Sequence, residues 1–483
     1  MQEGKQLVRI VLFMLLLLGH ISAAALTLPA SNSAVNIVPH SRYLIDVNST
    51  LSPQTVLQRL EDFTTYEDAI YNFGFVDRPI WILFDVNFSR AYPDEWVMRI
   101  DYPHIDRFVF YRVDGNRLVP MGENGDRVVC GSGPECRTYW QPLLHHGDHA
   151  RYLLYLQTEG ALQVPMVAQT LREAYHDESR ANLLFGLYYG MLVLLLLYNL
   201  VLYAVVREVH YLNYLLFLGA YLLFQLNFDG IGKEWLWPEN TWMSNDGLSF
   251  FIFLSAIFAF RFSRQFLMLR QYAPKIEKVV YFGEIASFFG LAASVIFSYH
   301  IAIITAAVWS SIIPWVLIYA GFRVLPHYRA ARYYVIGWIV FLIGTIVLAL
   351  NELGVLATHP LMFYAQQIGS LLQMILLSFA LADRINMMKI DSVARLREFN
   401  EQLQEKIANK VEELRQKDRM MIQQSRQAAM GEMIENIAHQ WRQPLNQLSL
   451  IQSNIFFEYQ LGTLDDKKME EYRQQSEDLM EYM

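Results

Sequence analysis

Charged residues are scarce in this chain of 483 residues: Asp, Glu, Lys and Arg make up 18% of it, while hydrophobic residues make up 54%. That balance is unusual for a soluble protein and predicts that much of the chain lies in a membrane. Positive charge is in the shortest supply, since the net charge is -8 and no basic patch interleaved with aromatic residues offsets it. We therefore expect no nucleic-acid partner.

Cysteine is nearly absent as well. The two cysteines, Cys130 and Cys136, both lie in the stretch CGSGPEC. Their spacing is poor for zinc, and His145 and His146 have no partners at ligand spacing, so we expect no metal site. In an exported segment the two cysteines favour a disulfide-closed loop, with two free thiols as the alternative.

Residues 1–25 have the pattern of a secretory signal peptide. Lys5 and Arg9 precede the apolar run IVLFMLLLLG, and small residues then give a cleavage site that ends at Ala25. Because the apolar run is short for a membrane span, we favour a cleaved signal over an uncleaved anchor. In either case the residues that follow are expected outside the cytoplasm.

Residues 36–172 alternate polar and apolar side chains with the period of β-strands. The regular spacing of these runs and a turn at VDGN predict a β-sandwich, with Leu51–Phe63 as a helical insertion. Aromatic side chains on the strands could stack on a sugar, although such residues more often belong to a core. The aromatic residues concerned are Trp81, Trp96 and Tyr111, and the strand runs are Ile80–Phe88, Glu95–Pro103, Arg107–Gly115 and Arg151–Gly160.

Residues 183–382 contain seven apolar segments, each close to the roughly 20 residues that a bilayer span needs. Lys and Arg concentrate in alternate loops, so the positive-inside rule places those loops and the C-terminus in the cytoplasm and the sandwich outside. The predicted spans are Leu183–Val206, Tyr211–Phe228, Leu248–Phe266, Val279–Tyr299, Ala302–Phe322, Tyr333–Leu350 and Leu361–Ala382.

Two residues within the spans stand out. Glu284 either takes part in a polar contact that switches between receptor states or, as we favour, snorkels or pairs with Lys278 near the start of its span. Pro314 is expected to kink the fifth span, which commonly reflects packing alone.

A long polar helix is expected after Ala382, because the next glycine along the chain is Gly431 and the next proline is Pro444. Hydrophobic residues repeat there with heptad spacing, which predicts a coiled coil over 385–425 and a homodimer. A plain solvated helix is the alternative. The apolar seam residues are Leu396, Leu403, Ile407, Leu414 and Met421, and the polar ones are Asn400, Lys410 and Lys417.

His439 lies in the segment ENIAHQWRQPLNQL, off an apolar helix face. Pro444 has no N–H to return to the carbonyl of Gln440, so we expect the helix to bend one turn after His439. Glu435, four residues earlier, shares the face of His439 and could orient its ring. The apolar face comprises Met433, Ile434, Ile437, Trp441, Leu445 and Leu448.

The stretch AHQWRQPLN resembles the phosphoacceptor box of bacterial sensor histidine kinases, in which a histidine precedes a proline by five residues in the first helix of a dimeric four-helix bundle. The resemblance implies that His439 is phosphorylated and that a response regulator is the output partner. A neutral imidazole has one ring nitrogen free to attack a γ-phosphoryl group. Most such kinases place an acidic residue directly after the histidine, whereas this chain has Gln440, which cannot act as a base.

The front of the chain, with WVMRIDYPHIDRFVFY, YLLYLQTEGALQVPMVA and seven spans, resembles the bacterial seven-transmembrane receptors with diverse intracellular signalling modules. Their second type of extracellular domain resembles carbohydrate-binding jelly rolls. The resemblance implies a sensor for a small extracytoplasmic ligand, with carbohydrate as one candidate class, embedded in the lipid of the bacterial inner membrane. A receptor or dimerisation scaffold without kinase activity is the alternative to a sensor histidine kinase, and a transporter is a weaker one.

A complete kinase of this type continues into a domain that binds ATP. Its asparagine-rich helix, Asp-x-Gly-x-Gly turn and Gly-rich lid do not occur after His439, so we expect no ATP site in this chain and interpret it as the front part of a kinase or a shortened product. Residues 426–483 would then form an incomplete hairpin of phosphoacceptor helices, with a turn at Gly462 and a helix cap at Thr463. The expected fold is a multidomain membrane protein with an exported, jelly-roll-like β-sandwich, a seven-helix bundle, a cytoplasmic coiled coil and an α-helical hairpin.

Overall fold

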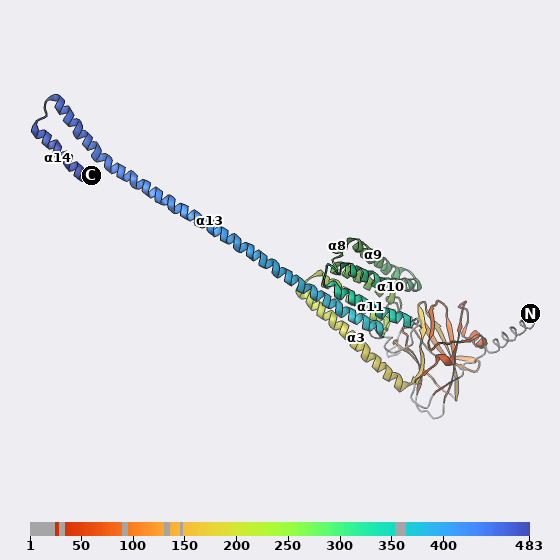
Figure 1. The fold of residues 1–483 in the computed structure, drawn as a ribbon. Coiled ribbons are helices and arrows are strands. Elements are labelled where there is room, and N and C mark those ends of the chain that lie inside the picture. The colour runs from red at the N-terminus through yellow and green to blue at the C-terminus, as the bar shows by residue number, and fades with distance from the viewer. Residues whose placement is uncertain (1–24, 29–33, 89–94, 130–135, 145–147, 353–363) are drawn as a thin grey trace, which may run out of the picture. The chain divides into compact units, whose positions relative to one another are not determined.

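The computed structural model describes residues 25–28, 34–88, 95–129, 136–144, 148–352 and 364–483 (Figure 1). The signal peptide up to residue 24, Cys130 and the pair His145 and His146 lie outside these described residues. Contacts divide the chain into two compact units, unit 1 (residues 1–386) and unit 2 (residues 387–483). The predicted fold class is confirmed: a sheet-rich domain comes first, seven apolar helices follow, and a long helix leads into a helical hairpin.

The β domain of unit 1 is built from two main sheets. Its strands are β1 (Leu26–Thr27), β2 (Val35–Asn36), β3 (Ser41–Ile45), β4 (Thr64–Thr65), β5 (Tyr71–Phe75), β6 (Ile80–Asn87), β7 (Trp96–Ile100), β8 (Arg107–Asp114), β9 (Arg117–Asn124), β10 (Tyr139–Pro142), β11 (His149–Gln157), β12 (Ala161–Val164) and β13 (Met166–Thr170). The larger sheet has the order β4-β3-β6-β11-β8-β9 with β1 beside β6, the smaller one has the order β10-β7-β13-β2, and β5 pairs with β12.

The large sheet is buried on both faces, which explains why β6 reads as a continuous apolar run. Ile82 and Phe84 join the core between the two sheets, whereas Trp81 and Leu83 lie on the opposite face against Val56. Val56 belongs to α2 (Pro53–Leu57), and a 3-10 helix (Leu60–Asp62) follows it, so the predicted insertion Leu51–Phe63 forms two short helices rather than one.

Two of the three aromatic residues considered for sugar stacking are core residues. Trp81 is 1% exposed and Trp96 is 4% exposed, whereas Tyr111 packs beside Trp81 and is only partly buried. The core interpretation is therefore confirmed for Trp81 and Trp96, because a side chain with almost no accessible surface offers no face to a sugar ring.

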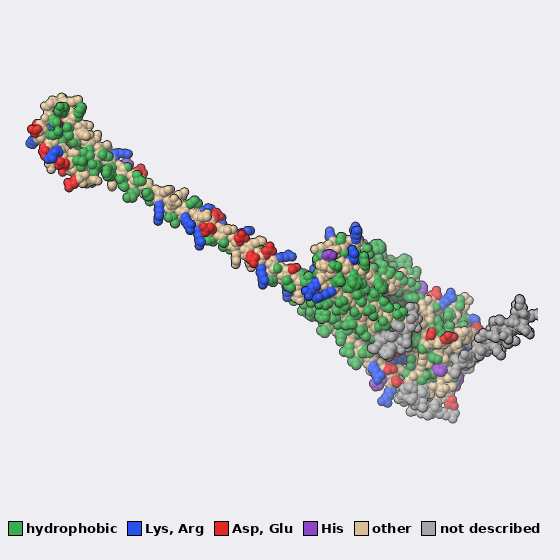
Figure 2. Space-filling model, viewed as in Figure 1, with side chains coloured by type: hydrophobic (Ala, Val, Ile, Leu, Met, Phe, Trp, Pro, Cys, Tyr) green, Lys and Arg blue, Asp and Glu red, His purple; other side chains and the backbone are tan. Residues whose placement is uncertain are grey.

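The helices of unit 1 are α3 (Leu171–Val206), α4 (Val209–Phe228), α5 (Ile231–Trp235), α6 (Thr241–Ser244), α7 (Gly247–Phe266), α8 (Leu269–Tyr272), α9 (Pro274–Ile296), α10 (Tyr299–Val324), α11 (Ala331–Glu352) and the start of α13 (Ala365–Leu461). Seven of them, namely α3, α4, α7, α9, α10, α11 and α13, are long and apolar enough to span a membrane. Figure 2 shows hydrophobic side chains over the visible surface of the bundle, as expected where lipid is the solvent.

The helix that carries the first predicted span, Leu183–Val206, begins twelve residues before that span, at Leu171. Thr170 ends β13 and caps α3, since its hydroxyl accepts a hydrogen bond from the backbone N–H of Glu173 at 3.3 Å. The last strand of the β domain therefore passes into the first membrane helix without a linker.

Glu284 pairs with a residue other than the expected one. Its Oε2 atom lies 3.2 Å from Nη2 of Arg264 on α7, and Arg264 also lies 3.8 Å from Glu277. The pairing with Lys278 is wrong, because Lys278 precedes Glu284 by six residues on α9 and so projects from a different side of that helix. Pro314 lies within α10, where it is buried.

Unit 2 consists of the remainder of α13 and α14 (Asp466–Tyr482), joined by a turn at Gly462 whose φ is +66°. The predicted turn is confirmed, but the cap of α14 is Asp465 rather than Thr463. The Asp465 carboxylate accepts from the N–H of Lys468 at 2.8 Å, while the Thr463 hydroxyl donates back to the carbonyl of Glu458 at 3.4 Å.

Candidate functional site

A buried ionic cluster joins the β domain to the helices of unit 1. We name it the Arg137 cluster and define it as Arg99, Arg137, Glu178 and Glu234. Arg137 donates from Nη2 to the Glu178 carboxylate and from Nε to Oε2 of Glu234 at 3.3 Å. Arg99 lies on β7, and its Nη2 is 3.6 Å from Oε2 of the same Glu178. One carboxylate at the start of α3 is therefore held between two arginines of the β domain.

The charged side chains of the Arg137 cluster are almost completely buried. Arg99, Arg137 and Glu178 are 7%, 5% and 4% exposed. Buried charges of this kind are tolerated only when they are paired. Arg99 also pairs with Asp101, whose Oδ1 lies 2.5 Å from its Nε, and Arg137 also pairs with Glu234. Glu178 is the carboxylate that the two arginines share. Burial also raises the pKa of Glu234, and Arg137 opposes that rise.

A second group of polar residues, the Asp126 cluster, contains Asp106, Asp126, Arg127, Lys233 and Asn245. Asp126 accepts from the Asn245 side chain at 3.0 Å, Arg127 lies 3.1 Å from Asp106, and Lys233 donates to the carbonyl of Gly125. Burial raises the pKa of Asp126, and the neighbouring Asp106 carboxylate raises it further. Burial lowers the pKa of Lys233, so both groups of this pair are shifted toward their neutral forms.

Two histidines add hydrogen bonds between the β domain and the helix ends. His104 Nε2 lies 2.9 Å from the carbonyl of Phe228, at the end of α4, and His300 Nδ1 lies 2.6 Å from the carbonyl of Glu159. Because a carbonyl only accepts, His104 carries its proton on Nε2. Burial lowers the pKa of His104 to about 4, so the ring is neutral at pH 7.

Acidification should weaken this junction through His104. The pKa of His104 is about 4 in the folded state against 6.5 for the free side chain, so its stabilising contribution is present above pH 6.5 and is lost as the pH falls toward 4. Between pH 7 and pH 5 the loss should be about 2 kcal/mol. His104→Gln keeps an N–H donor but does not titrate. The thermal midpoint of the variant should therefore change less over that pH range than the midpoint of the wild type, and equal changes would contradict the assignment.

Asp229 connects three helices just beyond the end of α4. It accepts hydrogen bonds from Tyr189 on α3 at 2.6 Å, from Gln225 on α4 at 3.1 Å and from Gln367 on α13 at 3.0 Å. Burial raises the pKa of Asp229 to about 6, although the three donors favour the charged form. The first and last membrane helices are thus tied to one carboxylate beside the β domain.

The predicted phosphoacceptor residues lie on α13 in unit 2. His439 and Glu435 are exposed, Pro444 is buried, and α13 continues through Pro444 as a helix. Among the described residues no hydrogen bond or ion pair joins Glu435 to His439, so the orienting role of Glu435 stays a prediction, as does the bend at Pro444. Trp441 and Ile437 on the adjoining apolar face are 51% and 42% exposed in the single chain.

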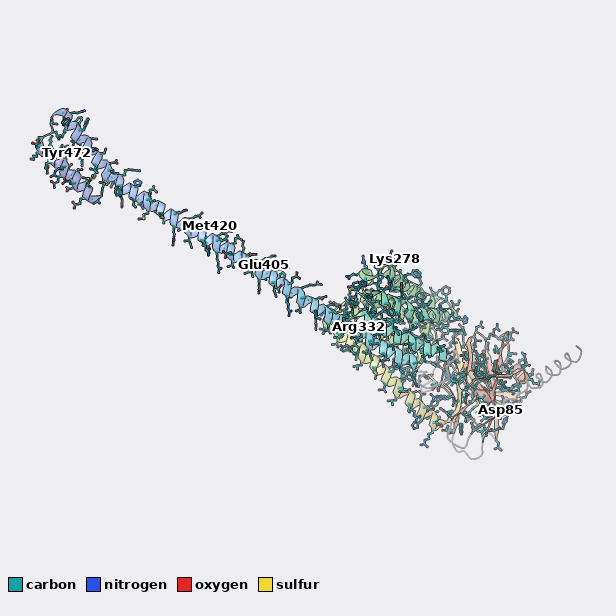
Figure 3. All side chains as sticks on the ribbon, in the orientation of Figure 1. Asp85, Lys278, Arg332, Glu405, Met420 and Tyr472 are labelled. Carbon is teal, nitrogen blue, oxygen red and sulfur yellow. The ribbon has the colours of Figure 1, made fainter. Side chains whose placement is uncertain are left out.

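The heptad residues of α13 are equally uncovered. Leu403, Ile407 and Leu414 are 44%, 55% and 52% exposed. In Figure 3 the labelled Glu405 and Met420 stand off α13 with no other element beside them. A helix with this much exposed apolar surface is compatible with the predicted coiled coil, and the homodimer stays a prediction.

Within the described residues there is no group of three or more His, Cys, Asp or Glu that could hold a metal ion. The expected absence of an ATP site stays a prediction. Cys136 is buried, and because Cys130 lies outside the described residues the predicted disulfide stays a prediction.

Two family models match the chain. Residues 181–384 match the model described as 7TM diverse intracellular signalling, and residues 38–170 match that described as 7TMR-DISM extracellular 2. The chain carries both 7TMR-DISM domains. Its β domain corresponds to the extracellular domain of these receptors and its bundle to their membrane domain, so it is a multi-pass membrane receptor. No curated protein matches the chain.

The boundary between the two matches falls at the junction. The extracellular 2 match ends at residue 170, where Thr170 caps α3, and the 7TM match begins at residue 181. Glu178 lies between them and is the carboxylate that both arginines of the Arg137 cluster contact. The junction of this 7TMR-DISM receptor is therefore built largely on the first turns of α3.

Proposed function

We propose that this receptor is the sensing part of a histidine kinase in a two-component system. The β domain binds a small extracytoplasmic ligand, with carbohydrate as one candidate class, and His439 accepts a phosphoryl group that passes to a response regulator. One observation carries the proposal: an exposed histidine five residues before a proline follows a heptad helix on the same chain as both 7TMR-DISM domains.

The exposure of His439 suits this role. A phosphoacceptor must be reached by a catalytic domain and by a response regulator in turn, which a buried side chain does not allow. An uncharged imidazole supplies the attacking nitrogen, and transfer then depends on positioning and charge stabilisation. We assign the role of phosphoacceptor to His439, and we assign no role in ATP binding to the described residues of this chain.

A receptor or dimerisation scaffold without kinase activity is the second candidate. Gln440 favours it, because a glutamine cannot take the proton that an acidic neighbour of the histidine would accept. Incubating membranes that contain the native protein with labelled ATP separates the two functions. Acid-labile phosphate on the peptide that contains His439 supports the kinase, and its absence under conditions that label a known kinase supports the scaffold.

The proposed orientation places the β domain outside the bacterial inner membrane and the part of α13 that follows the seventh span in the cytoplasm. The α4 end at Phe228 and the α10 start at His300 contact the β domain. The basic loops lie at the other helix ends, and Figure 3 shows Lys278 and Arg332 at the end of the bundle remote from the β domain. This distribution agrees with the positive-inside rule.

Homodimerisation through α13 gives the proposal its second test. Leu403→Asp places a charge on the apolar seam, where the partner helix would bury it, so we expect the dimer to weaken by at least about tenfold. Gln402→Asp adds the same charge one residue away, outside the seam, and should leave the dimer intact. Cross-linking yield and mass in detergent measure both variants. Equal behaviour of the two would contradict a coiled coil in this register.

A further inference from the structure

A partly open cavity lies between five helices of the seven-helix bundle, α4, α7, α10, α11 and α13. It leaves about 100 Å³ for the centre of a water molecule. One water needs about 10–15 Å³ on that measure, so the cavity has room for several waters or for one small organic molecule. Its lining includes Phe217, Tyr221, Phe224, Trp338, Phe341 and Gln373.

The cavity extends toward the junction with the β domain. Tyr221 and Phe224 lie in the last turns of α4, just before Phe228, whose carbonyl His104 contacts. Gln366 lines the cavity from the first turn of α13, next to Gln367, which donates to Asp229. A molecule in the cavity would therefore contact Gln366, which adjoins one of the three residues that donate to Asp229.

Gln373 is the polar residue that the fold leaves without partners. Its side chain is fully buried, and within the described residues neither Nε2 nor Oε1 has a hydrogen-bond partner. Gln225, which is buried to the same degree, is paired with both Asp229 and Tyr221. A buried carboxamide without partners destabilises a fold, so its position on a cavity wall indicates that a bound molecule supplies the missing contacts.

Other unpaired polar groups face the same space. Oε1 of Gln366 has no partner among the described residues. Pro314 and Ser310 both line the cavity on α10, and a proline at position 314 cannot donate to the carbonyl of Ser310. The cavity thus offers one amide donor and several acceptors, set among aromatic side chains.

The lining also defines the charge of the occupant. None of the described residues that line the cavity is Asp, Glu, Lys, Arg or His, so a charged molecule would be desolvated there without a counter-ion. Water alone is a poor occupant of the apolar part, because each water requires two to four polar partners.

We propose that this cavity binds a small neutral amphipathic molecule. Its apolar body lies between the aromatic side chains of α4 and α11, and one amide-like group, which both donates and accepts, pairs with Gln373. The site is distinct from the β domain and gives the receptor a second input, placed within the membrane. This inference does not depend on phosphorylation of His439.

Benzamide is the probe that tests the proposal, because it combines one aromatic ring with one carboxamide. With the full-length protein in lipid nanodiscs, saturation-transfer NMR should show saturable benzamide binding above the signal of empty nanodiscs, with a Kd below about 1 mM. Gln373→Leu should weaken benzamide roughly 10- to 100-fold, because the ligand amide loses its partner. Toluene, which lacks the amide, should bind the variant at least as well as the wild type.

The stability of the ligand-free variants provides an independent readout. Gln373→Leu should raise the thermal midpoint, since it removes an unpaired buried amide, whereas Gln225→Leu should lower it, since it removes a paired one. Gln373→Met serves as a second variant if leucine does not fit. The proposal is overturned if benzamide shows no saturable binding to the wild type, or if removing the Gln373 amide leaves its affinity unchanged.

Discussion

Replacing His439 with glutamine should reduce phosphorylation of the native protein at least about a hundredfold, to background. Glutamine matches the length and polarity of histidine but has no basic ring nitrogen to attack a phosphoryl group. His439 is exposed on α13, and among the described residues it has no hydrogen bond or ion pair that its removal would break, so the fold should not change. The measurement is acid-labile phosphate on the full protein in membranes after incubation with labelled ATP.

Glu435→Gln is the matched control for this variant, since it alters an exposed side chain one turn earlier on the same helix face. It should lower the rate by a smaller factor and leave phosphate on His439. Unchanged cross-linking of both variants through α13 would show that dimerisation is intact. If the His439→Gln protein retains acid-labile phosphate, the phosphoacceptor is another residue.

The features that the sequence predicts well are those set by neighbouring residues. The spans follow from apolar length, the strands β6, β8 and β11 from their composition, and the turn at Gly462 from a residue that adopts positive φ readily. Their physical causes act over a few residues. The family matches later agreed with the resemblance seen in the β domain and spans.

The features that the sequence did not predict depend on residues far apart in the chain. Glu284 was assigned to Lys278 because they are near in sequence, whereas its partner Arg264 comes from another helix. The N-cap of α14 is Asp465, because its carboxylate accepts a hydrogen bond from the backbone N–H of Lys468. Sequence spacing alone does not decide between Asp465 and the nearby polar residue Thr463.

The sequence does not predict the Arg137 and Asp126 clusters for the same reason, although Arg99 indicates that a charged partner is needed. Arg99 interrupts the strand WVMRI, every residue of which is buried. A charged residue in a fully apolar strand requires a partner of opposite sign. The structure identifies two such partners: Asp101, two residues further along the chain, and Glu178, near the start of a helix that the apolar pattern began later. Only the first of them is near in sequence.

The junction also bears on how a signal leaves the β domain. Because β13 runs directly into α3, a movement of the small sheet is passed to the first membrane helix without a flexible linker. The Arg137 cluster fixes the side of α3 that faces the β domain, and Asp229 ties α3 to α13. A two-state change at this junction would need to exchange these contacts, which makes Glu178 the residue whose loss should have the largest effect.

Glu178→Gln should therefore destabilise the junction by about 1–3 kcal/mol, because Arg99 and Arg137 lose the carboxylate that they share and keep Asp101 and Glu234 as their closest charged partners. The expected result is a lower thermal midpoint and faster protease cleavage between the β domain and the bundle, since local opening exposes the chain there. Asp177→Asn is the matched control: Asp177 is adjacent, 42% exposed at its side chain and 4.0 Å from Arg99, so its loss should cost about 0.5 kcal/mol or less. Equal protease sensitivity of Glu178→Gln and Asp177→Asn would mean that Glu178 does not hold the β domain to the membrane helices.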